Sequence, residues 1–202
     1  MVRYRGAKLR IIRRLGDLPA FSNKKSKSSQ RPGQHGATPK KVTQYGMRLE
    51  EKQKLRFNYG ISEKQLINYI KQAKRLKGAT GNILLQLLEM RLDNLIFRLG
   101  MAPTIAAARQ LVGHKHILIN NKCVSIPSYQ CQPGDLLSVK ENKSAKERVL
   151  NFLESPALSN IPQHLDFDRK NLTAKILGIV DREWVALKLN ELFVIEFYSR
   201  KI

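Results

Sequence analysis

Four stretches of the chain repeat apolar residues at the three- and four-residue spacing of an amphipathic helix. They cover residues 45–59, 62–78, 80–99 and 104–113, and each is followed by a glycine or ends on one. The second begins with Ser62-Glu63-Lys64-Gln65, a capping-box sequence that marks a helix start. The third carries an uninterrupted leucine-rich stripe, which is typical of a helix packed in a core. These stretches predict a mainly helical first half of the chain.

Residues that favour β-structure follow the fourth predicted helix. Strands are expected over 115–119 and 122–126, joined by a tight turn at Asn120-Asn121. A second turn at 133–135 precedes a further strand over 136–139. Two helices packed on this short, strongly twisted sheet would form a compact unit of roughly 50–60 residues. The predicted fold class is therefore α+β, with a mainly helical first domain and a module of two helices on a small twisted β-sheet.

The charge of the chain narrows the possible functions. Its 202 residues include 37 Lys and Arg against 16 Asp and Glu, for a formal net charge of +21. Residues 1–60 hold 16 of these cations and 3 of the acids, whereas residues 141–202 hold 10 and 9. Such an excess is unlike an ordinary soluble enzyme and indicates a polyanionic partner, contacted mainly by the first two-thirds of the chain. The longest apolar runs are far shorter than the roughly 20 residues that cross a bilayer, so no membrane role is expected.

The N-terminal segment interleaves Arg3-Tyr4-Arg5-Gly6 with four further cations before the first acid, Asp17. Arginine can clamp a phosphate and stack on bases, and tyrosine offers a stacking face. We expect this segment to become ordered on a nucleic acid; the alternative is a solvated basic tail. Residues 22–36 form a polar loop in which Gly33 and Gly36 bracket Gln34 and His35, so that the backbone can approach a partner closely. The alternative for this loop is a flexible linker.

The paired-helix module carries its own positive and hydrogen-bonding groups, and these predict a second contact with the partner. Any one of them could instead be a surface charge without a role. Asp93 has no cation three or four positions away, so we expect its partner to come from another element. The candidate groups of this module are Arg91, Asn94, Arg98, Arg109, Lys115, His116 and Lys122.

Several motifs in fixed order resemble the bacterial-type family of small-subunit ribosomal protein S4, over nearly the whole chain. The motifs are Pro32-Gly33-Gln34-His35-Gly36, Leu49-Glu50-Glu51-Lys52-Gln53-Lys54-Leu55-Arg56, Arg91-Leu92-Asp93-Asn94, Ala108-Arg109-Gln110-Leu111-Val112 and His114-Lys115. Residues 84–94 and 98–104 are most similar to chloroplast members. With the absence of a transit peptide before Arg3, this implies synthesis in the plastid and a place on the ribosome of the chloroplast stroma; the alternative is a bacterial cytoplasm.

The resemblance implies a domain organisation. Residues 1–45 would be a basic RNA-binding extension, residues 46–89 with 190–202 a helical domain, and residues 90–189 an inserted domain. The paired-helix module would occupy about 90–140, and a C-terminal helix over 191–198 would pack back on the first domain. Residues 142–169 match the family poorly, and the sequence assigns no helix or strand to them.

The resemblance also implies a function: binding of small-subunit ribosomal RNA at a multi-helix junction, early in subunit assembly, next to other ribosomal proteins. Messenger RNA would be a further partner, because Lys40 and Lys41 fall where the family lines the channel through which the messenger enters. The RNA-binding residues expected from the motifs and from the charge pattern are Arg3, Tyr4, Arg5, Arg10, Arg13, Arg14, Gln34, His35, Lys40, Lys41, Tyr45, Arg48, Lys52, Lys54, Arg56, Arg91, Asn94, Arg98, Arg109, His114, Lys115, His116 and Lys122.

No cofactor or metal is expected. Some members of the family hold zinc through N-terminal cysteines, but the first cysteine here is Cys123, and Cys123 and Cys131 are read as reduced thiols. An RNA-modifying enzyme with the same module would need a catalytic domain, and His164 with Asp166 and Asp168 is too small a set. A helix-turn-helix DNA regulator is disfavoured by the sheet that follows the second helix. We therefore expect a structural protein and not an enzyme.

Overall fold

The computed structural model describes residues 4–28, 30–38, 41, 43–153 and 161–199, apart from the side chain of Ser144. The chain divides into two compact units, one formed by Met1–Leu84 with Ala186–Ile202 and the other by Leu85–Val185. Among the described residues, no helix combines the length and the apolar character needed to cross a membrane.

The first unit is helical. It contains α1 (Lys8–Leu15), α2 (Gln44–Asn58), α3 (Glu63–Arg75), the first part of α4 (Thr80–Glu89) and α8 (Glu191–Ser199). The helices predicted over 45–59 and 62–78 are confirmed as α2 and α3. The predicted capping box is present, because the Ser62 hydroxyl accepts from the Gln65 N–H at 3.3 Å and the Gln65 side chain accepts from the Ser62 N–H at 3.1 Å.

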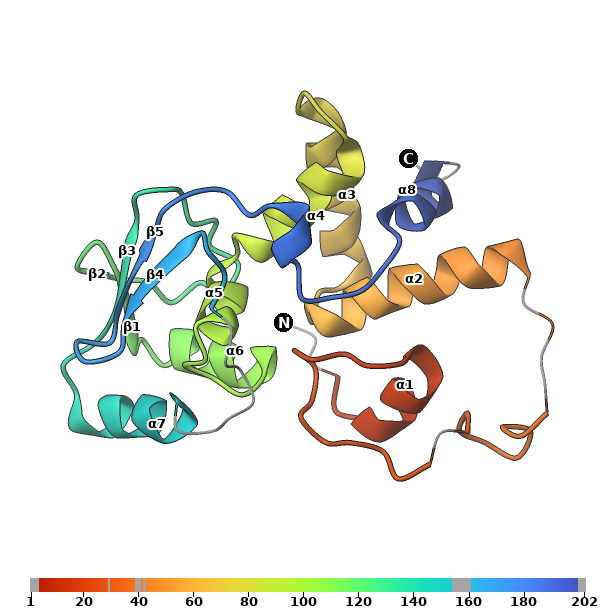
Figure 1. The fold of residues 1–202 in the computed structure, drawn as a ribbon, viewed down its shortest axis with the longest axis horizontal. Helices are drawn as coiled ribbons and strands as arrows, with labels where there is room; N and C mark the ends of the chain where they lie inside the picture. Colours follow the sequence, from red (N-terminus) through yellow and green to blue (C-terminus); the bar gives the residue numbers. More distant parts are fainter. Residues whose placement is uncertain (1–3, 29, 39–40, 42, 154–160, 200–202) are drawn as a thin grey trace. The chain divides into compact units, whose positions relative to one another are not determined.

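The last helix of the chain packs against the earlier helices of the first unit. Figure 1 shows α8 lying beside α2, although the two are far apart in the sequence. Tyr198 of α8 donates a hydrogen bond to Glu63 of α3, and Lys52 of α2 lies over the ring of Phe197 at 4.8 Å. Residues 186–199 therefore complete the core of a unit that begins at the other end of the chain.

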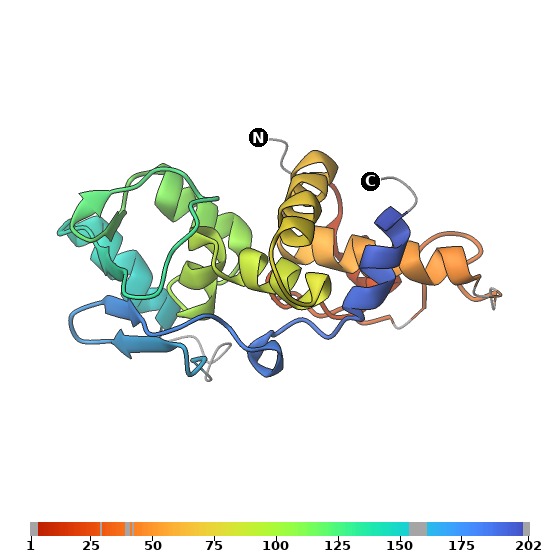
Figure 2. The same ribbon diagram turned by 90° about the horizontal axis from the view of Figure 1, so that it is seen from above.

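The second unit joins helices to one antiparallel sheet. Figures 1 and 2 show α5 and α6 packed together beside the sheet. The strands follow the order β2-β1-β3-β5-β4, and every pair is antiparallel. The elements are α5 (Leu92–Arg98), α6 (Ile105–Gly113), β1 (Ile117–Ile119), β2 (Lys122–Cys123), β3 (Leu136–Val139), α7 (Lys143–Leu153), β4 (Leu165–Asp168), β5 (Thr173–Ile176) and the short 3₁₀ helix η1 (Arg182–Trp184).

The first turn of the sheet forms as the sequence predicts. Asn120 and Asn121 have φ values of 50° and 64°, the left-handed pair that a tight hairpin turn requires and that asparagine tolerates. The turn sets Ile119 opposite Lys122. Alternate residues of β1, β3 and β5, among them Ile117, Leu137 and Ile176, are buried, so one face of the sheet belongs to the core.

One predicted helix is two helices in the structure. The apolar stripe over 80–99 predicts a single element, but α4 ends at Glu89 and α5 begins at Leu92, with Arg91 extended at φ −74° and ψ 140°. Arg91 forms an isolated antiparallel bridge with Gln130, and the Leu92 N–H donates to the Tyr129 carbonyl at 2.9 Å. Hydrogen bonds to a segment almost forty residues later therefore replace the helical ones at this point.

The strand predicted over 122–126 is also shorter than expected. β2 ends at Cys123, and Ile126 is exposed. The chain leaves the sheet here because the Pro127 and Tyr129 carbonyls accept hydrogen bonds from the start of α5. Residues 142–169, for which the sequence predicts no structure, contribute α7 and β4, and β4 and β5 extend the sheet to five strands.

Candidate RNA interface

The N-terminal segment forms part of its own small core. α1 places Ile12 and Leu15 on its buried face, and Leu18 and Phe21 beyond the helix are also buried. The Ala20 N–H donates to the Asn58 side chain at 3.1 Å, which ties the segment to the end of α2. The sequence predicts that this segment becomes ordered on a nucleic acid, whereas part of its order comes from contacts within the protein.

The opposite side of this segment is basic. Arg5, Arg10 and Arg14 are exposed and have no ion-pair partner among the residues that the structure describes. Tyr4 packs its ring on Phe57 at a centroid distance of 5.5 Å and keeps 41% of its surface exposed. Unpaired guanidinium groups beside an exposed aromatic ring suit phosphate binding and base stacking.

Arg13 has a different role, because its guanidinium group organises the polar loop. Its Nε donates to the Gln30 carbonyl at 2.8 Å, and its Nη2 contacts the Ser28 hydroxyl and the Arg31 carbonyl at 3.4 and 3.3 Å. The loop turns at Gly36, where a Cβ atom would lie 1.9 Å from the Arg31 carbonyl oxygen. Gln34 and His35 are both exposed at this turn, as the sequence predicts.

The cations of α2 are mostly paired inside the first unit. Lys52 is buried and lies 3.0 Å from Glu63, whose pKa the nearby Tyr198, Lys52 and Arg56 hold below its usual value despite the opposing effect of burial. The remaining pairs are Arg48–Glu196 at 2.7 Å, Lys54–Glu51 at 2.6 Å and Arg56–Glu63 at 4.0 Å. Lys52 therefore supports the contact between α2 and α3, whereas Arg48, Lys54 and Arg56 keep part of their surface exposed.

A buried charge network forms the centre of the second unit. The Asp93 carboxylate is fully buried and accepts from Arg91 Nε and Nη2 at 3.0 and 2.8 Å and from Arg109 Nε at 2.7 Å. Arg109 lies on α6, which confirms the expectation that Asp93 has a partner from another element. Because Arg91 is 1% exposed, it acts inside the fold, and its burial does not support the RNA contact expected of it.

A second set of buried polar side chains, Glu89, Asn94 and Arg98, lies at the end of α4 and on α5. Asn94 donates to the Glu89 carbonyl and carboxylate at 3.1 and 2.7 Å, and Arg98 Nε lies 3.7 Å from the same carboxylate. Arg98 also donates to the Trp184 carbonyl of η1. Asn94 and Arg98 are both buried, so these side chains join α4, α5 and η1, and their RNA contacts expected from the sequence lack an exposed surface.

The end of α6 presents one basic surface of the second unit. The His116 N–H donates to the Leu111 carbonyl and the Lys115 N–H to the Val112 carbonyl, the pair of bonds that defines a Schellman motif. Lys115 occupies the left-handed position of this motif, at φ 61°, where glycine is usual. A non-glycine residue there costs roughly 1–2 kcal/mol, and its exposed ammonium group is held at a fixed turn.

Further cations gather around this turn. His114 and His116 have ring centroids 5.9 Å apart, and the Lys140 N–H donates to the His116 carbonyl at 2.8 Å. Partial burial, followed by the charges of Arg148, His114 and Lys140, lowers the pKa of His116. Sequence reasoning missed Lys140 and Arg148, because only the folding of α7 and β3 brings them near His116. We call His114, Lys115, His116, Lys140 and Arg148 the α6-end surface.

The structure separates the predicted site residues into three sets. Two of the predicted residues, Arg3 and Lys40, lie outside the described residues. Five act mainly within the fold through burial or hydrogen bonds: Arg13, Lys52, Arg91, Asn94 and Arg98, with Arg109 largely engaged by Asp93. The set with exposed surface is Tyr4, Arg5, Arg10, Arg14, Gln34, His35, Lys41, Tyr45, Arg48, Lys54, Arg56, His114, Lys115, His116 and Lys122.

The cysteines and the acidic and histidine residues are the candidate metal ligands within the residues that the structure describes. The described part of the chain contains no cluster of three or more His, Cys, Asp or Glu side chains that could hold a metal ion. Both Cys123 and Cys131 are free thiols, and burial raises the pKa of Cys131 to about 12. His164 is buried, whereas Asp166 and Asp168 are exposed on β4.

Comparisons with known proteins agree with this picture. A model described as the ribosomal protein S4/S9 N-terminal domain matches residues 3–89, and one described as the S4 domain matches residues 90–137. The chain is 78% identical to the small ribosomal subunit protein uS4c of Emiliania huxleyi and 64% identical to that of Porphyra purpurea. It is 59% identical to the small ribosomal subunit protein uS4 of Thermosynechococcus vestitus, and all three matches cover the full length of both chains. The chain therefore belongs to the uS4 family of small ribosomal subunit proteins.

Proposed function

We propose that this chain is a structural, non-enzymatic component of the small ribosomal subunit that binds small-subunit ribosomal RNA. Family membership supports this proposal, and the names of the relatives, which are ribosomal proteins and not enzymes, agree with it. The observation that carries the RNA contact is the row of exposed cations without protein partners in the N-terminal segment, on a chain of net charge +21.

The binding mechanism follows from two basic surfaces. Arg5, Arg10 and Arg14 would contact phosphates from the first unit, and the α6-end surface would do so from the second. Each unit presents its cations on a folded element, so RNA helices of the right shape gain several contacts at once. This arrangement supports binding at a junction of several helices, early in assembly. We also propose the division into an extension over 1–45, a helical domain over 46–89 with 190–202, and an inserted domain over 90–189. The change from one family match to the other between residues 89 and 90 supports the start of the inserted domain, whereas α1 packs within the same unit as α2.

The location and a second partner are part of the same proposal. Relatives named uS4c support a place on the plastid ribosome. Messenger RNA is a candidate partner at Lys41, which is exposed. A photoreactive amino acid in place of Lys41 should crosslink to messenger RNA on assembled ribosomes, and crosslinks to ribosomal RNA alone would exclude this second role.

The RNA contact is tested by the salt dependence of binding. Contact with roughly ten phosphates gives a log–log slope of affinity against salt of about −7 to −9. Replacing Arg5, Arg10 and Arg14 with glutamine should make the slope shallower by about 2–3 in filter binding to small-subunit ribosomal RNA.

The matched control removes the same charge elsewhere. Arg169, Lys170 and Lys175 are exposed in the β4–β5 hairpin, and their replacement with glutamine should leave the slope within about one unit of the parent protein. Equal effects of the two triple variants would show that net charge alone drives binding, and would contradict the assignment of the N-terminal surface.

A further inference from the structure

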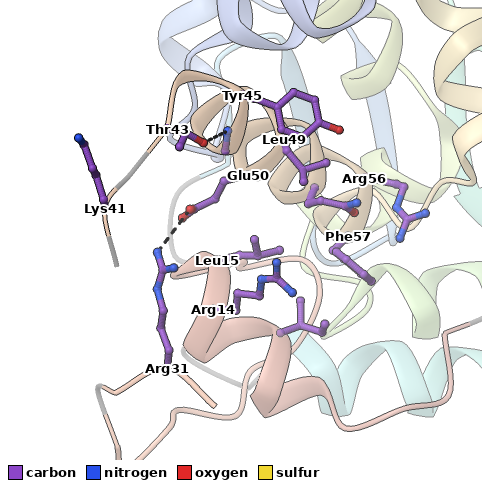
Figure 3. Close-up of a pocket in the computed structure, with 13 residues that line it drawn as sticks. Arg14, Leu15, Arg31, Lys41, Thr43, Tyr45, Leu49, Glu50, Arg56 and Phe57 are labelled. Carbon is purple, nitrogen blue, oxygen red and sulfur yellow. Dashed lines mark hydrogen bonds and ion pairs between the residues drawn. The ribbon is translucent and has the colours of Figure 1, made fainter. Parts of the chain in front are cut away.

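The first unit contains a hollow between α1 and α2, and Arg14, one of the cations assigned to phosphate contact above, lies in its lining. Its volume is about 460 Å³, within the range of roughly 300–1,000 Å³ typical of small-molecule sites. Figure 3 shows its two walls, with Arg14 and Leu15 from α1 and Leu49, Arg56 and Phe57 from α2. One face of each helix therefore lines the space, because the lining residues of each helix recur at helical spacing.

The floor of the hollow is apolar and partly aromatic. Ile11, Leu15 and Leu49 contribute aliphatic groups, and Phe57 contributes an aromatic ring. The Phe57 ring is held by edge contacts with Tyr4 and Phe21, at centroid distances of 5.5 and 5.7 Å. The Arg56 guanidinium group lies over the same ring at 4.8 Å, so a flat base in the hollow would meet an aromatic ring together with a stacked arginine.

The rim of the hollow is positive. Arg14, Arg31 and Arg56 line it against a single acid, Glu50, which lies 3.6 Å from Arg31. The first turn of α2 also faces the space, through Thr43 and Gly46, and its backbone N–H groups carry a partial positive charge. An occupant with an apolar flat part and a negative part would complement both floor and rim.

One polar atom in the lining has no partner. The Gln53 side chain lies between Leu49 and Phe57 on the same face of α2, and its Oε1 is shielded from solvent and accepts no hydrogen bond from the described residues. An unsatisfied buried acceptor costs roughly 1–3 kcal/mol, so an N–H donor from an occupant would remove a penalty.

We propose that this hollow binds one unpaired nucleotide of the ribosomal RNA, with the base against Leu49 and Phe57 and the phosphate at the arginine rim. The exocyclic or ring N–H of the base would donate to Gln53 Oε1, and Arg14 and Arg31 would contact the phosphate. This proposal rests on the proposed function, since the nucleotide belongs to the RNA that the chain binds. It adds a base-binding site to surfaces that otherwise recognise the sugar–phosphate backbone.

The test fills the hollow with a larger side chain and measures the chemical reactivity of the RNA bases. Full-length protein and the variant Leu49→Trp are bound to small-subunit ribosomal RNA, which is then probed with base-specific reagents and, separately, with hydroxyl radicals. We expect one unpaired base to lose reactivity with the parent protein and to regain it with Leu49→Trp, while the backbone footprint persists. The Kd should rise roughly 5- to 150-fold, the range that corresponds to one base–aromatic stack.

Two further variants separate the proposal from a folding defect. Met47→Trp adds the same side chain to an exposed position of α2 outside the hollow and should leave both base reactivity and Kd unchanged. Gln53→Met keeps the size of the side chain but removes the acceptor, and should weaken binding several-fold with unchanged circular dichroism.

The possible failures are distinguishable. A persistent backbone footprint with no base protected, or with the same base protected by Leu49→Trp, would overturn the nucleotide site and leave the proposed function intact. Protection of no part of the RNA by the parent protein would overturn the proposed function itself, and with it the site.

Discussion

Asp93→Asn should strongly destabilise the second unit, because Asp93 is the shared partner of two cations. Its carboxylate accepts three hydrogen bonds from Arg91 and Arg109 at 2.7–3.0 Å and is 0% exposed. Asparagine removes the negative charge and turns an N–H donor toward the guanidinium groups. Breaking a buried ion pair on one side costs roughly 3–5 kcal/mol, because the remaining charge stays buried without compensation.

The only tryptophan of the chain makes this loss measurable in the intact protein. Trp184 lies in η1 of the second unit, so its fluorescence during urea unfolding reports that unit. A loss of 3–5 kcal/mol corresponds to a fall of the urea midpoint by roughly 1–5 M. In a thermal scan, each kcal/mol lowers the Tm of a unit of this size by about 4–8 °C.

A double-mutant cycle isolates the charge effect. Arg109→Met removes one of the two cations and leaves Arg91 paired with Asp93, so it should cost about 1–2 kcal/mol. Asp93→Asn should then be less damaging in the Arg109→Met background by at least about 1 kcal/mol. Asp166→Asn, on exposed β4, is the matched control and should change stability by no more than about 0.5 kcal/mol.

The reasoning would be refuted by a small effect. If Asp93→Asn lowered the free energy of unfolding by less than about 1 kcal/mol with an unchanged m-value, the two arginines would not depend on this carboxylate. Additive single effects in the cycle would likewise show that Arg109 and Asp93 do not act as a pair.

Three more predictions follow from local geometry. Lys115→Gly should relieve the strain of the left-handed backbone and raise the free energy of unfolding by about 0.5–1 kcal/mol, while the affinity for RNA falls. A fall in both the free energy of unfolding and the RNA affinity would show that the backbone at Lys115 is not strained. Burial next to Arg98 lowers the pKa of His164 from 6.5 to about 4, so the unfolded chain binds an extra proton between these values. Stability should therefore fall by about 3 kcal/mol as the pH drops from 6.5 to 4, and His164→Gln should remove most of this slope in pH-dependent urea unfolding. Ser62→Ala should cost the first unit about 1 kcal/mol in urea unfolding followed by far-UV circular dichroism, because Trp184 reports the second unit; a change below about 0.3 kcal/mol would mean that the capping box contributes little.

Local signals in the sequence were sufficient for much of the fold. The capping box at Ser62 and the Asn120-Asn121 turn act within a few residues, and the structure contains both. The break at Arg91 could not be read in this way, because it depends on the bridge to Gln130, which no helical periodicity encodes.

The site residues show the same limit. A cationic side chain is usually at the surface, so the sequence places Arg91 and Arg98 there. Their burial depends on Asp93 and Glu89 being brought to the right distance by the folded helices. Lys140 and Arg148 were missed for the converse reason, since their neighbours at the end of α6 come from distant parts of the chain.

The discontinuous first unit has a consequence for the order of events during synthesis. Residues 85–185 are contiguous and contain every strand that the structure describes, so this unit can fold as soon as its own residues have left the translating ribosome. The N-terminal helices, although made first, obtain the partners of Glu63 and Lys52 on α8 only when the last few residues emerge. Chains truncated before residue 191 and released from the ribosome should therefore protect residues 85–185 from protease better than the N-terminal helices.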